Sequence, residues 1–111
     1  MSIAENLAKV KRDIPENVKL VAVSKTKPNN DILEAYATGH KIFGENKAQE
    51  LVGKYESLPK DIEWHFIGHL QSNKVKYIAP FIDLMHGIDS LKILKVINKE
   101  AKKNERVIKC L

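Results

Sequence analysis

Residues 20–28 read Leu-Val-Ala-Val-Ser-Lys-Thr-Lys-Pro, and this stretch carries the strongest structural signal in the chain. The apolar run predicts a strand over residues 18–23 that is buried on both faces, and the closing proline would stop it soon afterwards. Side chains alternate along a strand, so Val21, Val23 and Lys25 share one face. We therefore expect an amine, withdrawn from water, where a core side chain would otherwise stand.

A buried ammonium must be paired, or its pKa must fall. A lysine with a lowered pKa is a nucleophile, and its usual chemistry is a Schiff base with a carbonyl compound. The alternative is that Lys25 has left the strand and is solvated, which composition alone favours because lysines are mostly exposed. The rest of the sequence favours the first interpretation.

The bulk composition indicates a small globular domain of 111 residues. Its formal charge of +5 is spread along the chain with few aromatic residues between the lysines, which favours a small anionic ligand over nucleic acid. No apolar run approaches the roughly 20 residues that span a bilayer, and the N-terminus does not resemble a signal peptide. The single cysteine, Cys110, fits a reducing compartment, so we expect a cytoplasmic protein.

Strands and helices alternate along the chain. Strands are predicted over residues 18–23, 41–43, 62–67, 81–85 and 106–111, with helices over residues 3–14, 30–38, 46–57, 72–79 and 90–101. Alternation without hairpin signals predicts right-handed βαβ units and a parallel sheet. Five strands do not close a barrel whose eight units take about 250 residues. We therefore expect an α/β fold in which residues 1–111 form the N-terminal portion of a single parallel (β/α) TIM-type barrel domain, with an open edge that self-association could cover.

Polar side chains follow four of the predicted strands where those strands end. They are Lys25, Asn46, His69 and His86, with Glu45, Gln71 and Asp89 beside them. The carboxyl ends of parallel strands meet at one edge of the sheet, and function gathers there in barrels. This convergence makes Lys25 a candidate site residue.

Each neighbour of Lys25 also has an ordinary structural explanation. Asn46 could equally cap the following helix, although a helix N-terminus also attracts anions. Glu45 is better explained as a first-turn acid facing the helix dipole, and Asp89 as part of a helix cap. His65 is better explained as a satisfied core histidine, whereas the two histidines at strand ends are stronger candidates for ligand contact. No metal-binding spacing, serine elbow or glycine-rich phosphate loop occurs.

Four segments in chain order resemble the pyridoxal phosphate homeostasis protein family, which is related to the N-terminal barrel of alanine racemase. These segments are residues 21–28, 43–50, 64–74 and 86–90. The resemblance implies a TIM-type barrel and the cofactor pyridoxal 5′-phosphate (PLP). Lys25 matches the cofactor lysine of the family, and Asn46 matches an asparagine near the cofactor. His69 and His86, at neighbouring strand ends, complete the cofactor-binding set that we expect.

The resemblance leaves two functions open. One is a non-catalytic PLP carrier that acts in vitamin B6 homeostasis and hands the cofactor to PLP-dependent apoenzymes. The alternative is a PLP-dependent, racemase-like enzyme, but Tyr36, Tyr55 and Tyr77 lie in helical segments away from the strand ends, whereas related racemases place a tyrosine opposite the lysine. Family members are about twice as long and take their phosphate-binding residues from later strands, so we expect PLP binding by this chain to be weak.

Overall fold

A computed structural model describes residues 3–14, 19–25, 27–88 and 90–110 of the chain. Within these residues, five strands form one parallel sheet in sequential order. They are β1 (Ala22–Val23), β2 (Ile42–Glu45), β3 (Glu63–Phe66), β4 (Leu84–Met85) and β5 (Lys109–Cys110). Parallel strands in chain order, each joined to the next through helical structure, are the arrangement of successive (β/α) barrel units, so the predicted fold class is confirmed.

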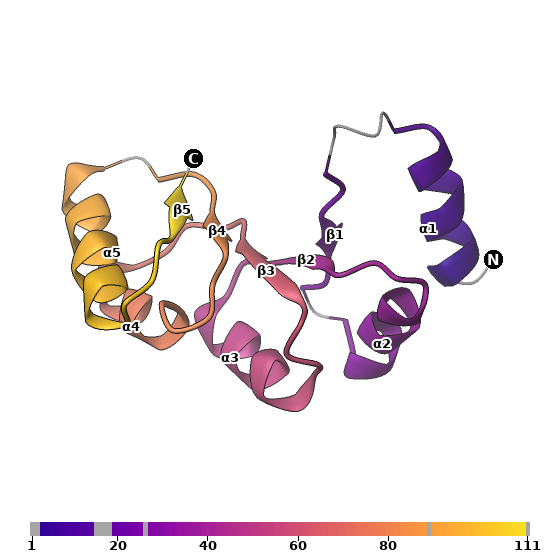
Figure 1. Ribbon diagram of the computed structural model, residues 1–111, viewed down its shortest axis with the longest axis horizontal. Coiled ribbons are helices and arrows are strands. Elements are labelled where there is room, and N and C mark those ends of the chain that lie inside the picture. The colour runs from indigo at the N-terminus through magenta and orange to yellow at the C-terminus, as the bar shows by residue number, and fades with distance from the viewer. Residues whose placement is uncertain (1–2, 15–18, 26, 89, 111) are drawn as a thin grey trace.

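The first of the described helices precedes β1, and the others occupy the crossovers between successive strands. They are α1 (Ile3–Arg12), α2 (Asn29–Ala37), α3 (Ala48–Ser57), the 3₁₀ turn η1 (Ser72–Lys74), α4 (Val75–Ile78) and α5 (Leu91–Lys103). Figure 1 shows α2, α3 and α4 along one side of the curved sheet, with β1 and β5 at its two ends. Within the described residues, none of these helices has the length and apolar character to cross a membrane.

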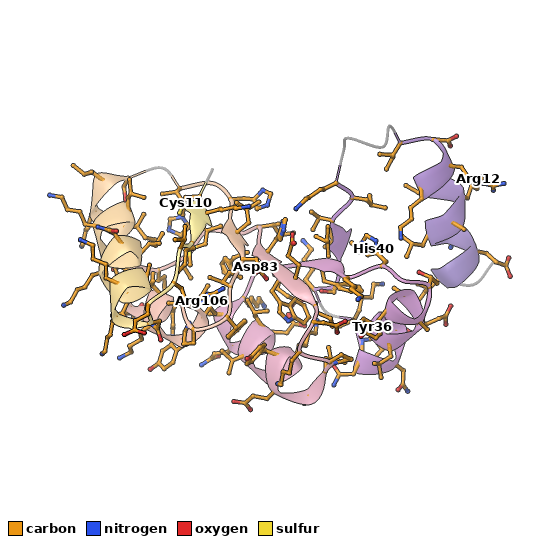
Figure 2. The ribbon with its side chains drawn as sticks, viewed as in Figure 1. Arg12, Tyr36, His40, Asp83, Arg106 and Cys110 are labelled. Carbon is orange, nitrogen blue, oxygen red and sulfur yellow. The ribbon has the colours of Figure 1, made fainter. Side chains whose placement is uncertain are left out.

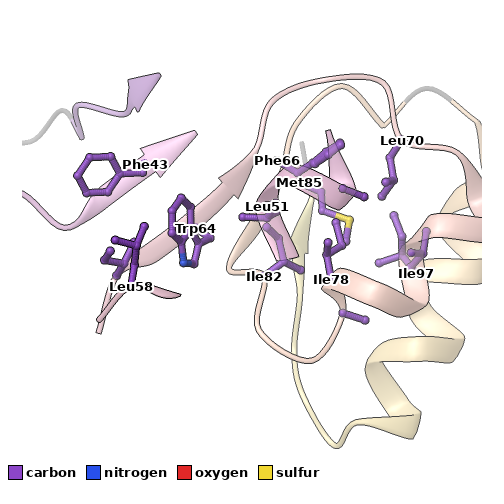
Figure 3. Packing of buried hydrophobic residues seen from close by; sticks show 14 of the residues in the cluster. Phe43, Leu51, Leu58, Trp64, Phe66, Leu70, Ile78, Ile82, Met85 and Ile97 are labelled. Carbon is purple, nitrogen blue, oxygen red and sulfur yellow. The ribbon is translucent and has the colours of Figure 1, made fainter. Parts of the chain in front are cut away.

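The core lies between the sheet and these helices. The register pairs Phe43 with Trp64 and Phe66 with Met85, and all four side chains are buried. They pack in one cluster with apolar residues of the surrounding helices (Figure 3). The contributing helix residues include Leu51, Ile78 and Ile97. Burial of each such side chain stabilises the fold by about 1.5–3 kcal/mol. Alternation along a strand predicts Trp64 and Phe66 on one face of β3, and the burial of both side chains against the helices confirms it.

The second strand is longer than predicted because it continues through Gly44 to Glu45. A Cβ at Gly44 would lie 3.0 Å from Val21 Cγ1 and 3.1 Å from Ile67 Cδ1. The missing side chain therefore lets the neighbouring residues close over the strand, where the sequence suggested a break. The first strand is also less buried than predicted, since Val23 is 51% exposed. Five strands do not enclose an inner face, so the side chains of β1 on that face stay accessible to solvent.

Of two helix caps that the sequence predicts, the structure contains one and lacks the other. A serine just before an apolar helical stripe predicts a cap at Ser90. Its Oγ accepts a hydrogen bond from the Ile93 amide at 3.3 Å, so this cap is confirmed. The sequence also predicts Asn29 or Asn30 as the cap of the second helix, but α2 begins directly after Pro28 without a side-chain cap. Pro28 already supplies the extended entry into the helix. The cap predicted at Ser2, the helix end at Pro15, the strand start at Val18 and the capping role of Asp89 lie outside the described residues.

The buried face of α5 is rotated from the predicted one. Apolar periodicity predicts a buried stripe of Leu91, Leu94, Ile97 and Ala101. Ile97 and Ala101 are buried as predicted, but the two leucines are exposed and Ile93 is buried in their place, four residues before Ile97. The C-terminal segment is then tied to the body of the fold by Arg106, which is labelled in Figure 2. Its Nη1 donates to the carbonyls of Ala79 at 2.7 Å and Ile82 at 2.9 Å.

Candidate functional site

Lys25 lies immediately beyond β1 at the carboxyl edge of the sheet. The preceding residue, Ser24, is buried, whereas Lys25 is exposed. The prediction that the Lys25 amine is withdrawn from water is therefore wrong. The reason is that β1 ends the sheet and has only β2 as a neighbour. The amine is open to a ligand approaching the carboxyl edge, and its role in binding stays a prediction.

Asn46 is held at the same edge by a close approach of two segments. A Cβ at Gly68 would lie 2.7 Å from Asn46 Cβ and 2.9 Å from its carbonyl oxygen, so only glycine leaves room for Asn46 there. Asn46 does not cap α3, which was the structural role considered for it. The cap position of α3 is Lys47, without a side-chain hydrogen bond, and the helix begins at Ala48.

Asn46 and His69 line one open hollow of about 580 Å³ between the ends of β2 and β3 and the start of α3. Lys47, Lys74 and Glu50 line it as well, so its lining carries two ammonium groups and one carboxylate. This positive balance is suited to an anionic ligand. Lys25 is not among the lining residues, so the structure brings Asn46 and His69 together but leaves Lys25 outside that hollow.

His86 belongs to a chain of hydrogen-bonded groups that starts on β3. His86 Nε2 lies 3.3 Å from His65 Nδ1, and His65 Nε2 lies 2.7 Å from Glu63 Oε2. Burial lowers the pKa of His86, and the nearby His65 lowers it further. Burial alone would raise the pKa of Glu63, but the hydrogen bond from His65 and the charge of Lys19 outweigh it and hold that pKa below its ordinary value.

The histidine chain has two consequences for the sequence predictions. The interpretation of His65 as a satisfied core histidine is confirmed, because both of its ring nitrogens have partners. His86 is half-buried at the end of β4, and its contact with a ligand stays a prediction.

A buried polar cluster behind Lys25 was not predicted. Glu45, at the end of β2, is fully buried rather than placed in the first turn of α3, so the helix-dipole interpretation of this residue is wrong. Its Oε2 accepts hydrogen bonds from Ser24 Oγ and from Lys54 Nζ, the latter at 2.9 Å. Lys54 Nζ also donates to the Ser24 carbonyl at 2.5 Å and lies 3.2 Å from Glu50 Oε2.

One signal in the sequence indicates that Lys54 is buried. Lys54 follows Leu51 by three residues and precedes Leu58 by four, and both leucines belong to the core. That spacing places the lysine on the apolar face of its helix. A lysine on such a face needs a buried partner of opposite charge, and no local pattern identifies Glu45 as that partner. Within the described part of the chain, no group of three or more histidine, cysteine, aspartate or glutamate residues is placed to hold a metal ion.

The molecule is thus a curved parallel α/β sheet whose strand ends carry an accessible lysine and a partly cationic hollow. The family described as "Alanine racemase, N-terminal domain" matches residues 1–111, and the chain belongs to that family. It is similar to the "Pyridoxal phosphate homeostasis protein" of Pasteurella multocida, with 44% identity over 113 residues that cover 90% of this chain and 48% of the relative. The chain therefore spans about half the length of the curated relatives it matches.

Solved structures give the same result. PipY of Synechococcus elongatus, determined without PLP, superposes with a TM-score of 0.93 at 39% identity, covering 98% of this chain and 52% of PipY. PipY with PLP bound superposes with a TM-score of 0.91 over the same shares of the two chains. The resemblance drawn from the four sequence segments is confirmed by these comparisons.

Proposed function

We propose that the protein binds PLP as a Schiff base with Lys25 and acts in vitamin B6 homeostasis as a non-catalytic carrier. The observation that carries the proposal is the position of Lys25, exposed at the carboxyl edge of a sheet that superposes on PLP-bound PipY with a TM-score of 0.91. PLP supplies an aldehyde and a phosphate. Attack of Lys25 Nζ on the aldehyde carbon forms a C=N bond and releases one water molecule.

The groups around the carboxyl edge fit such a ligand. Asn46 offers an amide, His69 an exposed imidazole and Lys74 a half-exposed ammonium to the hollow between β2 and β3. Lys27, two residues after Lys25, is also exposed and adds positive potential for a phosphate. We assign cofactor contacts to Lys25, Asn46, His69 and His86.

We further propose that residues 1–111 form the N-terminal portion of a single (β/α) barrel domain. Later strands would then enclose the inner face on which Val23 is exposed and would supply further phosphate contacts. The chain of 111 residues would accordingly bind PLP more weakly than a full-length version extended to the length of its relatives. The same open edge supports self-association of the short chain, and PLP-dependent apoenzymes are the recipients we expect for a carrier.

The positions of the tyrosines favour a carrier over a racemase. Turnover at an amino-acid α-carbon needs a proton donor and acceptor placed beside the reacting carbon. Tyr36 Oη donates to Asp61 at 2.6 Å, and Tyr55 stacks on Phe81 with ring centroids 3.9 Å apart. Tyr77 lies on α4. All three tyrosines are therefore on helices, and Tyr36 and Tyr55 contact residues that precede β3 and β4, at the edge of the sheet opposite to Lys25.

Reduction of the Lys25 adduct tests the cofactor proposal. A full-length version incubated with PLP and then freed of unbound PLP should be yellow, and borohydride should bleach the colour and fix the label on the peptide that contains Lys25. Lys25→Ala should be colourless after the same treatment, whereas Lys99→Ala, which removes an exposed lysine of α5, should be yellow. A colourless wild-type protein would contradict the proposal.

A second measurement separates the carrier from the enzyme. The loaded protein is incubated with L-alanine in deuterium oxide, and exchange at Cα is followed by NMR. A carrier should leave the Cα proton in place over many hours. Exchange that is fast and lost in Lys25→Ala would instead favour the racemase-like alternative.

A further inference from the structure

We propose that Lys54 and Glu45 are positioning residues that fix the backbone on which Lys25 stands. The inference rests on the proposed function only in taking Lys25 as the reactive amine. It concerns the buried cluster of Ser24, Glu45 and Lys54, which links three elements: the end of β1, the end of β2 and the middle of α3.

The contacts of Lys54 converge on the peptide bond that precedes Lys25. The Ser24 carbonyl, which is part of that peptide bond, accepts from Lys54 Nζ at 2.5 Å and from the Lys27 amide at 3.1 Å. The Ser24 amide donates to the Gly44 carbonyl at 3.0 Å. Both sides of Ser24 are therefore hydrogen-bonded, and the direction in which the chain enters Lys25 is set by these bonds.

Glu45 holds the other polar groups of the cluster in place. Its Oε2 accepts from both Ser24 Oγ and Lys54 Nζ, so one carboxylate oxygen connects the side chain next to Lys25 with the lysine of α3. With the Ser24 carbonyl and the carboxylates of Glu45 and Glu50, three acceptors surround the three protons of the Lys54 ammonium. Within the described residues, Glu45 Oε1 is buried without a hydrogen-bond partner.

The placement of the cluster indicates positioning rather than general stabilisation. A buried ion pair is often no better for stability than an apolar pair of the same volume, because both charges must lose their water. Here the lysine reaches from α3 to Ser24, the residue after β1, and among the described strands β1 pairs with none but β2. The cluster thus ties down the one strand end that carries the proposed nucleophile. Misplacement of a reacting group by about 1 Å can cost about 100-fold in rate, so such a tie bears directly on reactivity.

The first test measures amide hydrogen exchange in the full-length version without PLP. The Lys27 amide reports on the turn around Lys25, and the His86 amide, bonded to the Phe66 carbonyl at 2.8 Å, serves as a reference elsewhere in the sheet. In Lys54→Met the Lys27 amide should exchange about 10- to 100-fold faster while the His86 amide stays near its wild-type rate. The control Lys99→Met, on the exposed face of α5, should change neither amide.

The second test measures the borohydride-reducible adduct at Lys25. The rate constant for adduct formation with PLP should fall about tenfold or more in Lys54→Met, and its pH profile should shift, at a PLP concentration where Lys99→Met matches the wild type. Ser24→Ala, which removes one hydroxyl and keeps the Lys54–Glu45 pair, should change both measurements in the same direction by less. This milder variant decides the question if Lys54→Met does not fold.

The two proposals fail in different ways. If wild-type protein forms no adduct at Lys25, the cofactor assignment is wrong, and the exchange measurement still decides whether Lys54 holds the turn. If Lys54→Met, or Ser24→Ala in its place, lowers thermal stability but leaves the rate constant for adduct formation and its pH profile unchanged, the cluster is merely structural and the positioning role is overturned. Equal acceleration of the Lys27 and His86 amides would overturn it as well.

Discussion

The two faces of the sheet differ in how completely the rest of this chain covers them. On the outer face, Phe43, Trp64 and Phe66 are each at most 2% exposed beneath the helices. On the inner face, Val23 is 51% exposed and Lys25 lies open to solvent. A (β/α) unit covers its own outer face, because the helix that follows each strand packs back onto the sheet. The inner face of a barrel is covered only by strands from around the whole ring, which five strands do not provide.

The largest expected effect on stability comes from shortening one buried and one exposed side chain to alanine. Trp64→Ala should destabilise the chain by about 3–5 kcal/mol, because it opens a cavity in the outer core. Val23→Ala should change stability by no more than about 0.5 kcal/mol, because half of that side chain already contacts water. Urea unfolding measures both changes in stability. It is followed by far-ultraviolet circular dichroism rather than by tryptophan fluorescence, because Trp64→Ala removes the only tryptophan in the sequence. Similar costs for the two variants would mean that the inner face is as well packed as the outer one.

Two glycine-to-alanine substitutions are expected to change stability by smaller amounts and in opposite directions. Gly68→Ala should cost about 1–3 kcal/mol, because the new Cβ would collide with Asn46 and must displace it from the carboxyl edge. Gly53→Ala should stabilise the chain by about 0.5–1 kcal/mol, because Gly53 lies exposed in α3 with nothing within 4 Å of its Cβ position. Thermal unfolding distinguishes the two. A neutral Gly68→Ala would show that Asn46 is not held by close contact.

The smallest expected effect is the pH dependence of stability that arises from the buried His40. His40 is buried before β2, where its Nε2 donates to the Ile42 carbonyl at 2.8 Å, and burial lowers its pKa below the ordinary 6.5. The unfolded chain therefore binds a proton at His40 more readily than the folded chain does. Stability should be greatest above about pH 6.5 and fall as the pH drops toward the lower folded pKa.

A substitution isolates the contribution of His40. His40→Gln should flatten the loss of melting temperature between about pH 7.5 and 5.5. The remaining slope in His40→Gln is expected in part from His86, whose pKa is lowered as well. An unchanged slope in His40→Gln would assign the pH dependence to other groups.

Much of the fold could be predicted because its signals are local. The order of strands and helices, the parallel sheet, the buried face of Trp64 and Phe66 and the Ser90 cap each depend on residues within a few positions of one another. Element boundaries were less accurate where distant residues decide them. Gly44 remains in β2 because Val21 and Ile67, from two other segments, occupy the space beside it.

The candidate site divides in the same way. Lys25, Asn46, His69 and His86 were located at the carboxyl ends of strands by alternation alone, and the structure places each of them beyond the strand expected. The pairing of His86 with His65 spans 21 residues, and that of Lys54 with the Ser24 carbonyl spans 30. No periodic pattern within a single element contains these partners.

By itself, the sequence determined which elements form, in what order they alternate and at which edge the polar residues gather, because backbone preference and apolar periodicity act over short stretches of chain. Only the tertiary structure decided that the Lys25 amine is exposed, that Glu45 is buried and that Lys54 reaches the peptide bond before Lys25. Exposure and pairing depend on which remote surfaces come into contact. That contact is a property of the assembled sheet rather than of any one segment.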